Sequence, residues 1–313
     1  MKNQLLIPLF LTVVATLGGC RASTLPVTRS ALGTPRQPAD LLAVIDLPGP
    51  LTVDTVVSAY WEVDLDGLLD LSDPKAKAAG LTNRGEPIEV DFHAIRHPQL
   101  GLFVVDTGVE RAERDDPEHV HVRGLVRKVM NGDKSRMVDP FGAWLGRQSD
   151  RLQGVMLTHM HLDHVCGMPD VPAHTPVYTG PGEATGKQLD HLFTQGLTDD
   201  LMAGQDQVSE WPFVAAADGG LAVVDVFGDG SLWALATPGH TPGSTAYLAR
   251  TPTGPILLTG DTCHTAWGWQ NGVPLGSFTA DRDANRRSLN ALRELAARHP
   301  KMQVRLGHQR LVP

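Results

Sequence analysis

The sequence lacks the features of several classes of protein. Only three of its 313 residues are cysteines, so we expect no framework of disulfides. Positive charge is not in excess, and a net charge of −8 makes nucleic acid an unsuitable partner. No internal repeat or low-complexity tract is present. With 42% hydrophobic and 20% charged residues, the composition excludes wholesale disorder and fibrous structure and predicts a globular protein.

The N-terminus has the pattern of an export signal. Lys2 supplies a positive charge, and the apolar run from Leu5 to Leu17 is shorter than the ~20 residues of a membrane-spanning helix. The tetrapeptide Leu17-Gly18-Gly19-Cys20 resembles the bacterial lipobox, which implies cleavage before Cys20 and lipidation of its side chain. We therefore interpret residues 1–19 as a lipoprotein-type signal peptide, with a plain signal peptide as the alternative.

This interpretation places the mature protein outside the cytoplasm. By analogy with other lipoproteins, Arg21 after the cysteine favours the periplasmic side of the outer membrane, with membrane contact only through a lipidated Cys20. Residues 20–40 are rich in Ser, Thr, Pro and Arg, which predicts a flexible tether. Residues 41–313 show no break in composition and are expected to form one domain.

Short apolar runs predict strands, and fewer segments have helical spacing. Strands are expected over 51–63, 88–95, 102–105, 155–157, 221–227, 232–236, 245–248 and 256–258. Helices are expected from Asp116-Pro117 through Val129, over 182–193 and over 283–298. Their interleaving favours layers of helix packed on sheet.

One cluster of polar residues carries the functional signal. The buried strand that ends at Thr158 runs directly into His159-Met160-His161-Leu162-Asp163-His164. Two histidines separated by one residue point the same way on an extended backbone, and an Asp and a His follow after a turn. Imidazole and carboxylate ligands suit Zn²⁺, Mn²⁺, Fe or Co.

Three later segments repeat the pattern of an apolar run that ends in a ligand-type residue. His240 lies in the Pro/Gly turn Thr237–Ser244, Asp261 follows the run 256–258, and His308 follows Leu306-Gly307. Strand ends that converge on one edge of a sheet would bring these side chains together.

The combined motifs resemble the metallo-β-lactamase-fold hydrolase superfamily over roughly Val44 to Arg310. The resemblance implies an α/β fold, a single-domain four-layer αββα sandwich, with two divalent metal ions at the sheet edge. Zn²⁺ is the first expectation, with Mn, Fe or Co as alternatives. It implies that His159, His161 and His240 bind the first ion, that Asp163, His164 and His308 bind the second, and that Asp261 bridges both. Asp106, in Asp-Thr-Gly, matches a supporting position.

Among the activities of this superfamily, the sequence is most similar to N-acyl-homoserine lactonases of the quorum-quenching type. Asp261 is a carboxylate where the class B β-lactamases mostly lack one, and the segment Val273–Phe278 precedes a helix that contains Ser288-Leu289. The expected reaction is the opening of a lactone, or the cleavage of an ester, by a hydroxide shared between the two ions. The alternatives are a β-lactamase and a non-catalytic binding lipoprotein on the same fold.

Asp163 and His264 are the residues expected to take part in catalysis, the first as a ligand. His264 stands where that family commonly has a tyrosine, and it could hydrogen-bond the oxyanion or donate a proton. A surface or supporting histidine is the alternative. Trp267, Trp269 and Phe278 could line an apolar pocket for an acyl chain. Cys166 and Cys263 either pair or remain buried thiols.

Overall fold

The structure is a computed structural model that describes residues 20–188, 191–217 and 220–311. The predicted signal peptide over 1–19 lies outside these residues. Within the described ranges, no helix combines the length and the apolar character needed to cross a membrane.

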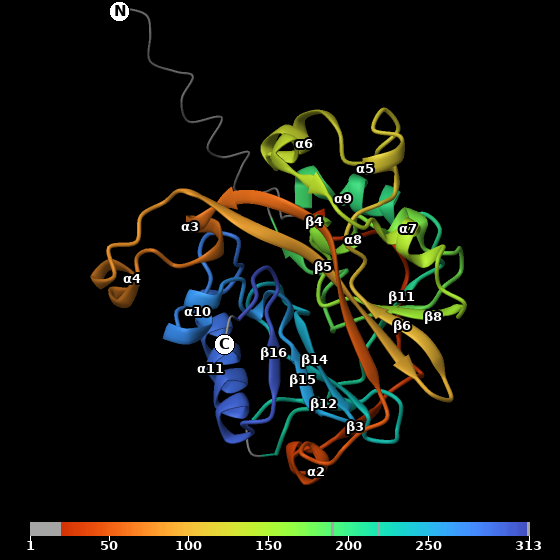
Figure 1. Ribbon diagram of the computed structural model, residues 1–313, viewed down its shortest axis with the longest axis vertical. Helices are drawn as coiled ribbons and strands as arrows, with labels where there is room; N and C mark the ends of the chain where they lie inside the picture. The colour runs from red at the N-terminus through yellow and green to blue at the C-terminus, as the bar shows by residue number, and fades with distance from the viewer. Residues whose placement is uncertain (1–19, 189–190, 218–219, 312–313) are drawn as a thin grey trace, which may run out of the picture.

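Two sheets form the centre of the molecule (Figure 1). The larger has the order β2-β11-β9-β8-β6-β5-β4-β7, the smaller β16-β15-β14-β13-β12-β3, and β1 pairs with β10. The strands are β1 Cys20–Arg21, β2 Val27–Arg29, β3 Thr34–Arg36, β4 Thr52–Asp64, β5 Gly85–His97, β6 Gly101–Val105, β7 Arg136–Met137, β8 Leu152–Met156, β9 Val177–Thr179, β10 Lys187–Gln188, β11 Val208–Glu210, β12 Val223–Asp225, β13 Leu232–Ala236, β14 Thr245–Thr251, β15 Gly254–Leu258 and β16 Gln303–Arg305.

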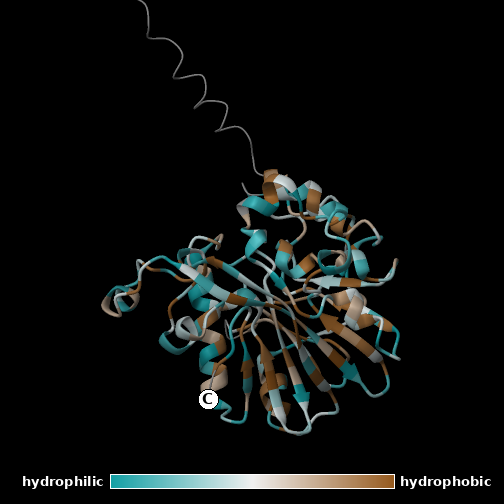
Figure 2. Ribbon diagram, turned by 45° about the horizontal axis from the view of Figure 1, so that its top comes forward, coloured by the Kyte–Doolittle hydropathy of each residue, from teal (hydrophilic) through white to brown (hydrophobic). Residues whose placement is uncertain are grey.

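The two sheets pack face to face through their apolar side chains. Ile95 and Met156 of the larger sheet share a buried cluster with Tyr247 and Leu258 of the smaller one. Figure 2 shows hydrophobic residues along the strands of both sheets. Burial on both faces explains why several strands read as continuous apolar runs in the sequence.

Helices cover the outer faces. Phe92 and Ala94 point from β5 toward α7 and α8, while Leu292 and Leu295 of α11 pack on the outer face of the smaller sheet. The helices are α2 Pro38–Val44, α3 Leu65–Leu68, α4 Pro74–Ala78, α5 Ala112–Asp115, α6 Gly124–Val129, α7 Phe141–Leu145, α8 Leu162–Val165, α9 His191–Leu201, α10 Ala266–Asn271 and α11 Arg282–Arg298, with 3-10 turns η1 Gly132–Lys134, η2 Met168–Asp170 and η3 Gly260–Thr262. The expected four-layer αββα sandwich is confirmed.

The flexible tether expected over residues 20–40 is wrong for this structure. β1 pairs with β10, β2 extends the larger sheet beside β11, and β3 extends the smaller sheet beside β12. The side chain of Asp199 accepts hydrogen bonds from Ser23 and Thr24. Polar residues suit edge strands that have one wet side, so their composition did not distinguish an edge strand from a tether.

Two of the three predicted helices also need correction. The helix expected from Asp116 to Val129 is α6 alone, preceded by a turn and by α5, and residues 182–193 contain a loop, β10 and only the start of α9. The helix expected over 283–298 is confirmed as α11, where the Asp281 side chain accepts a hydrogen bond from the Ala284 amide and caps the first turn.

Candidate metal centre

The ligand-type side chains gather at one edge of the sandwich. His159 and His161 follow β8, His240 lies in the turn between β13 and β14, and His308 follows β16. Asp261 lies in η3 directly after β15, whose neighbour β16 runs parallel to it. The strands therefore deliver residues that are up to 149 positions apart in the sequence to one small volume.

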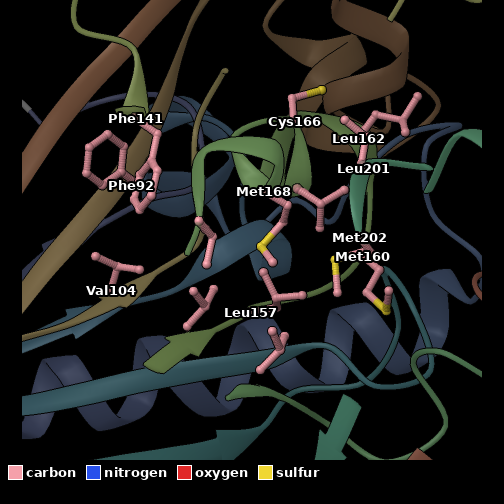
Figure 3. Close-up of a cluster of buried hydrophobic side chains, with 14 of the residues drawn as sticks. Phe92, Val104, Phe141, Leu157, Met160, Leu162, Cys166, Met168, Leu201 and Met202 are labelled. Atoms are coloured by element: carbon pink, nitrogen blue, oxygen red, sulfur yellow. The ribbon is translucent and has the colours of Figure 1, made fainter. Parts of the chain in front are cut away.

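Alternation along the loop after β8 separates ligands from core residues. Met160 and Leu162 point into the buried cluster between the larger sheet and its helices, as Figure 3 shows. The intervening His161 is turned toward His240 instead, with 2.9 Å between its Nδ1 and the Nε2 of His240.

The first group contains three imidazoles in mutual contact. The Nε2 atom of His240 lies 3.1 Å from Nε2 of His159 and 2.9 Å from Nδ1 of His161. His159 and His240 are almost completely buried. Three imidazole nitrogens this close are the donor set of a tetrahedral zinc site with one position left open.

The second group shares Asp261 with the first. The Asp163 Oδ2 atom lies 3.8 Å from Nε2 of His164 and 3.4 Å from Nε2 of His308. Five imidazole Nε2 atoms surround Asp261 Oδ2 at 3.0–3.6 Å; they belong to His159, His164, His240, His264 and His308. The structure thus brings together all seven predicted ligands and His264.

The protonation of these rings shows whether a cation fits. His308 Nδ1 donates to the carbonyl oxygen of Glu89, and His164 Nδ1 donates to Asp106, so a neutral ring turns the lone pair of Nε2 toward Asp261. Within the described residues His164 Nε2 has no hydrogen-bond partner. Lone pairs that crowd a carboxylate oxygen repel one another unless cations lie among them. The donor set therefore fits divalent metal ions.

In the metal-free chain the buried imidazoles and the Asp261 carboxylate shift one another's pKa. Burial and the neighbouring imidazoles lower the pKa of His159 and His240 well below the usual value. Burial opposes charge on His308, but the Asp261 carboxylate outweighs it and raises the pKa of His308 to about 9. Burial likewise opposes ionisation of Asp261, and the surrounding imidazoles hold its pKa well below the usual range. Asp261 is thus a carboxylate at neutral pH.

Asp106 supports the cluster from outside the groups of close ligand atoms. Its carboxylate accepts hydrogen bonds from the amide and hydroxyl of Thr158 and from Nδ1 of His164, the last at 2.8 Å. Such a partner fixes the orientation of a ligating ring. This agrees with the supporting position that the resemblance implied.

Glu183 is a buried carboxylate that the sequence did not single out. It accepts hydrogen bonds from the Met160 amide at 2.8 Å, the Thr241 hydroxyl at 2.6 Å and the Gly243 amide at 3.0 Å. Glu183 therefore links the loop of His159 and His161 to the turn of His240. Its place in a loop that reads as a weak helix gave no signal of this role.

Two glycines permit the close packing of the site. A Cβ atom at Gly239, whose φ is +141°, would lie 2.1 Å from the backbone nitrogen of Asn285 on α11. A Cβ atom at Gly307 would lie 2.2 Å from Oδ1 of Asp261. A larger residue at either position would displace His240 or Asp261.

A cavity of about 930 Å³ opens over the cluster. Its lining includes His161, Asp163, His240, Asp261, His264 and His308, with apolar side chains on either side: Ala22, Trp61, Val63, Leu68, Ile88, Met130, Met160, Leu162, Phe278 and Ala280. Further polar residues, among them Asn131, Lys187 and Thr198, also line the cavity, and its size is suited to a small organic molecule.

The aromatic residues that line the cavity differ in part from those expected from the sequence. Phe278 lines the cavity as expected, but Trp267 and Trp269 pack in hydrophobic clusters, and Trp61 of β4 is the tryptophan in the wall. His191 at the start of α9 also lines the cavity.

Cys166 and Cys263 are buried thiols, the second of the two arrangements expected from the sequence. The described part of the chain contains Cys20, Cys166 and Cys263 as free thiols, and Cys166 and Cys263 are buried in separate clusters. The pairing between them is therefore not formed in this structure.

Comparison with known proteins identifies the family of this chain. The family model described as Metallo-beta-lactamase superfamily matches residues 93–308. The N-acyl homoserine lactonase AttM of Agrobacterium fabrum is 30% identical over 233 residues, which cover 71% of this chain and 82% of that protein. The metallo-hydrolase mfmC of Annulohypoxylon moriforme is 25% identical over 252 residues, covering 77% and 61%.

A solved structure of a quorum-quenching N-acyl homoserine lactone lactonase shares the fold. It superposes with a TM-score of 0.58 at 18% identity and covers 84% of this chain and 93% of that one. The extent of the family match, the relatedness to AttM and the shared fold lead to one conclusion: the chain belongs to the metallo-beta-lactamase superfamily and is a metal-dependent hydrolase related to N-acyl homoserine lactonases.

Proposed function

We propose that the protein is a dinuclear metal-dependent lactonase that opens N-acyl homoserine lactones or closely related esters. The observation that carries the proposal is the shared oxygen of Asp261, which lies among five imidazole nitrogens at the base of a large, mostly apolar cavity. The names of its relatives support a lactone as the substrate.

In this proposal the ligands fall into two sets joined by Asp261. His159, His161 and His240 hold the first ion, and Asp163, His164 and His308 hold the second. Zn²⁺ is the ion we expect, and when bound the pair supplies a water that is reactive at neutral pH and an electrophile for the carbonyl oxygen. The ligands and the residues that fix them position both functions beneath the cavity.

The cavity would select the substrate by its apolar part. Trp61, Ile88 and Met130 form apolar wall near the cluster, and the indole nitrogen of Trp61 is held by a hydrogen bond to the carbonyl of Asn131 at 3.1 Å. An acyl chain placed against these side chains leaves water, while its carbonyl group lies over the histidines and Asp261.

A substrate panel tests the proposal. Purified protein loaded with Zn²⁺ is offered an N-acyl homoserine lactone, an aryl ester, a thioester and a β-lactam, and the rate of hydrolysis of each is measured. We expect the lactone to have the highest kcat/KM and the Asp261→Asn variant to lose at least about 100-fold of it. Preferential turnover of the β-lactam would make the protein a β-lactamase, and no turnover with two ions bound would favour a binding protein.

Export and lipidation form a separate proposal that rests on the N-terminal sequence. The expected location is the periplasmic side of the outer membrane, with attachment through Cys20. Mass spectrometry of the mature protein tests this, because lipidation adds acyl chains to a first residue Cys20, whereas a chain that retains residues 1–19 would contradict it.

A further inference from the structure

His264 is the residue at the cluster whose role the sequence left open. It is 1% exposed and follows η3, three residues after Asp261. Its Nε2 atom lies 3.0 Å from Oδ2 of Asp261, nearer than any of the other four imidazole Nε2 atoms around that oxygen.

The other ring nitrogen determines what Nε2 can do. His264 Nδ1 lies 3.2 Å from the backbone carbonyl oxygen of Leu68, which can only accept a hydrogen bond, so Nδ1 carries the proton. In the neutral ring Nε2 is then an acceptor that faces the carboxylate oxygen of Asp261. Such a ring has no proton on Nε2 to donate to a substrate oxygen.

His308 has the same arrangement. Its Nδ1 donates to the carbonyl oxygen of Glu89, and its Nε2 lies 3.3 Å from Oδ2 of Asp261. A histidine that binds metal almost always donates its other ring nitrogen in this way. His264 is therefore prepared as a ligand to the same degree as His308, which is already assigned to the second ion.

The neighbours of His264 place it between the two groups of ligands. Its ring centroid lies 5.2 Å from that of His240 and 5.2 Å from that of His308. One ligand atom each from His240, Asp261 and His264 lie within 4.8 Å of one another. A cation beside Asp261 would thus be within reach of His264 as well.

A hydrogen bond from Nε2 of His264 to Oδ2 of Asp261 is the competing explanation for the 3.0 Å contact. It needs a proton on Nε2, whereas the contact of Nδ1 with the Leu68 carbonyl places the proton of the neutral ring on the other nitrogen.

We propose that His264 is an eighth metal ligand, whose Nε2 binds a divalent cation together with Asp261 and His240. The inference rests on the metal centre of the proposed function and goes beyond it, since it replaces the expected proton donor with a ligand. The shell on the His240 side then contains one more nitrogen than the resemblance implies.

Metal affinity and cobalt spectra test this inference. The variants are His264→Gln and His264→Ala, and the matched control is His97→Gln, which removes a buried histidine that pairs with Asp229 away from the site. Zn²⁺ affinity is measured by competition with a chelator, and the visible absorption bands of the Co²⁺-loaded protein report the number and kind of ligands.

We expect both His264 variants to bind one of the two ions at least about tenfold more weakly and to change the cobalt bands, while the control matches the wild type. Unchanged cobalt bands would overturn the inference, even with weakened affinity, because His264 would then only hold Asp261 in place.

A measurement on the unaltered chain covers the case in which the variants do not fold. In the wild type labelled with ¹⁵N at histidine, addition of Zn²⁺ should shift the Nε2 resonance of His264 and leave Nδ1 protonated. An Nε2 resonance that Zn²⁺ does not move would overturn the inference. None of these measurements uses hydrolysis, so a failure of the lactonase proposal is recognised separately by the substrate panel.

Discussion

Glu183 allows a quantitative test of how His159, His161 and His240 are held in place. Its carboxylate is 3% exposed and accepts three hydrogen bonds, from the amides of Met160 and Gly243 and the hydroxyl of Thr241. In Glu183→Gln the amide nitrogen faces one of these donors, so one backbone N–H loses its acceptor at a cost of about 2 kcal/mol. In Glu183→Ala all three donors are left inside the protein, and we expect a loss of about 4 kcal/mol in the free energy of unfolding.

The same change should be seen in the affinity for metal. Met160 lies between His159 and His161, and Thr241 follows His240, so loosening these contacts moves three nitrogens relative to one another. Substitution of a residue that supports metal ligands in this way typically lowers metal affinity by about 10- to 100-fold. We expect Glu183→Gln to lower the affinity for the ion proposed to lie among these three nitrogens by this factor. The affinity is measured by competition with a chelator, and the stability by urea denaturation.

Glu110→Gln is the matched control. Glu110 is also 3% exposed and accepts hydrogen bonds from the backbone amide and the ring of His121, which is not one of the predicted ligands. It should lower the stability without altering the affinity for Zn²⁺. Destabilisation by Glu183→Gln and Glu183→Ala with unchanged metal affinity would refute the positioning role and leave Glu183 a purely structural residue.

Other perturbations probe the pocket, the metal and a buried base. Trp61→Ala should lower kcat/KM about tenfold for a long-chain lactone and much less for a short-chain one, and equal losses would exclude Trp61 from the acyl-chain wall. Removal of the ions by a chelator should lower the unfolding temperature, because a ligand present at about 1,000 times its Kd stabilises the folded state by about 4 kcal/mol; an unchanged temperature would contradict a resident metal. Burial, with repulsion from Arg305, lowers the pKa of His93 to about 3, below the usual value for histidine of about 6.5, so His93 in the unfolded chain takes up a proton first as the pH falls. In the metal-free protein this should cost about 3 kcal/mol between about pH 7 and about pH 4.5, a loss that denaturation curves should find reduced in His93→Gln but not in the exposed His119→Gln.

Much of the candidate site could be predicted because its residues follow strands. His159, Asp261 and His308 each come directly after an apolar run, and strand ends meet at one edge of a sheet. The layers of the fold followed from the same runs, since a strand buried on both faces has little polar interruption.

The rest depended on contacts between segments that have no local signal. The role of Glu183 is recognisable only from the two loops that it joins. The role of Trp61 is recognisable only from its place in the cavity lining, which the sequence of β4 does not reveal. The N-terminal segment was misread because its short edge strands, which contain Thr, Pro and Arg, have the composition of a linker. The weak helix expected over 182–193 failed because β10 pairs with a strand about 167 residues earlier, which no short window of sequence contains.

The pairing of β1 with β10 makes the first described residues part of the cavity wall. Ala22 lines the cavity directly, and the carbonyl oxygen of Cys20 lies 3.1 Å from the ring of His191, which lines it as well. A fusion partner or purification tag joined immediately before Cys20 would have its junction beside this cavity wall. Kinetic constants for this protein should therefore be compared between a fusion of this kind and the untagged chain.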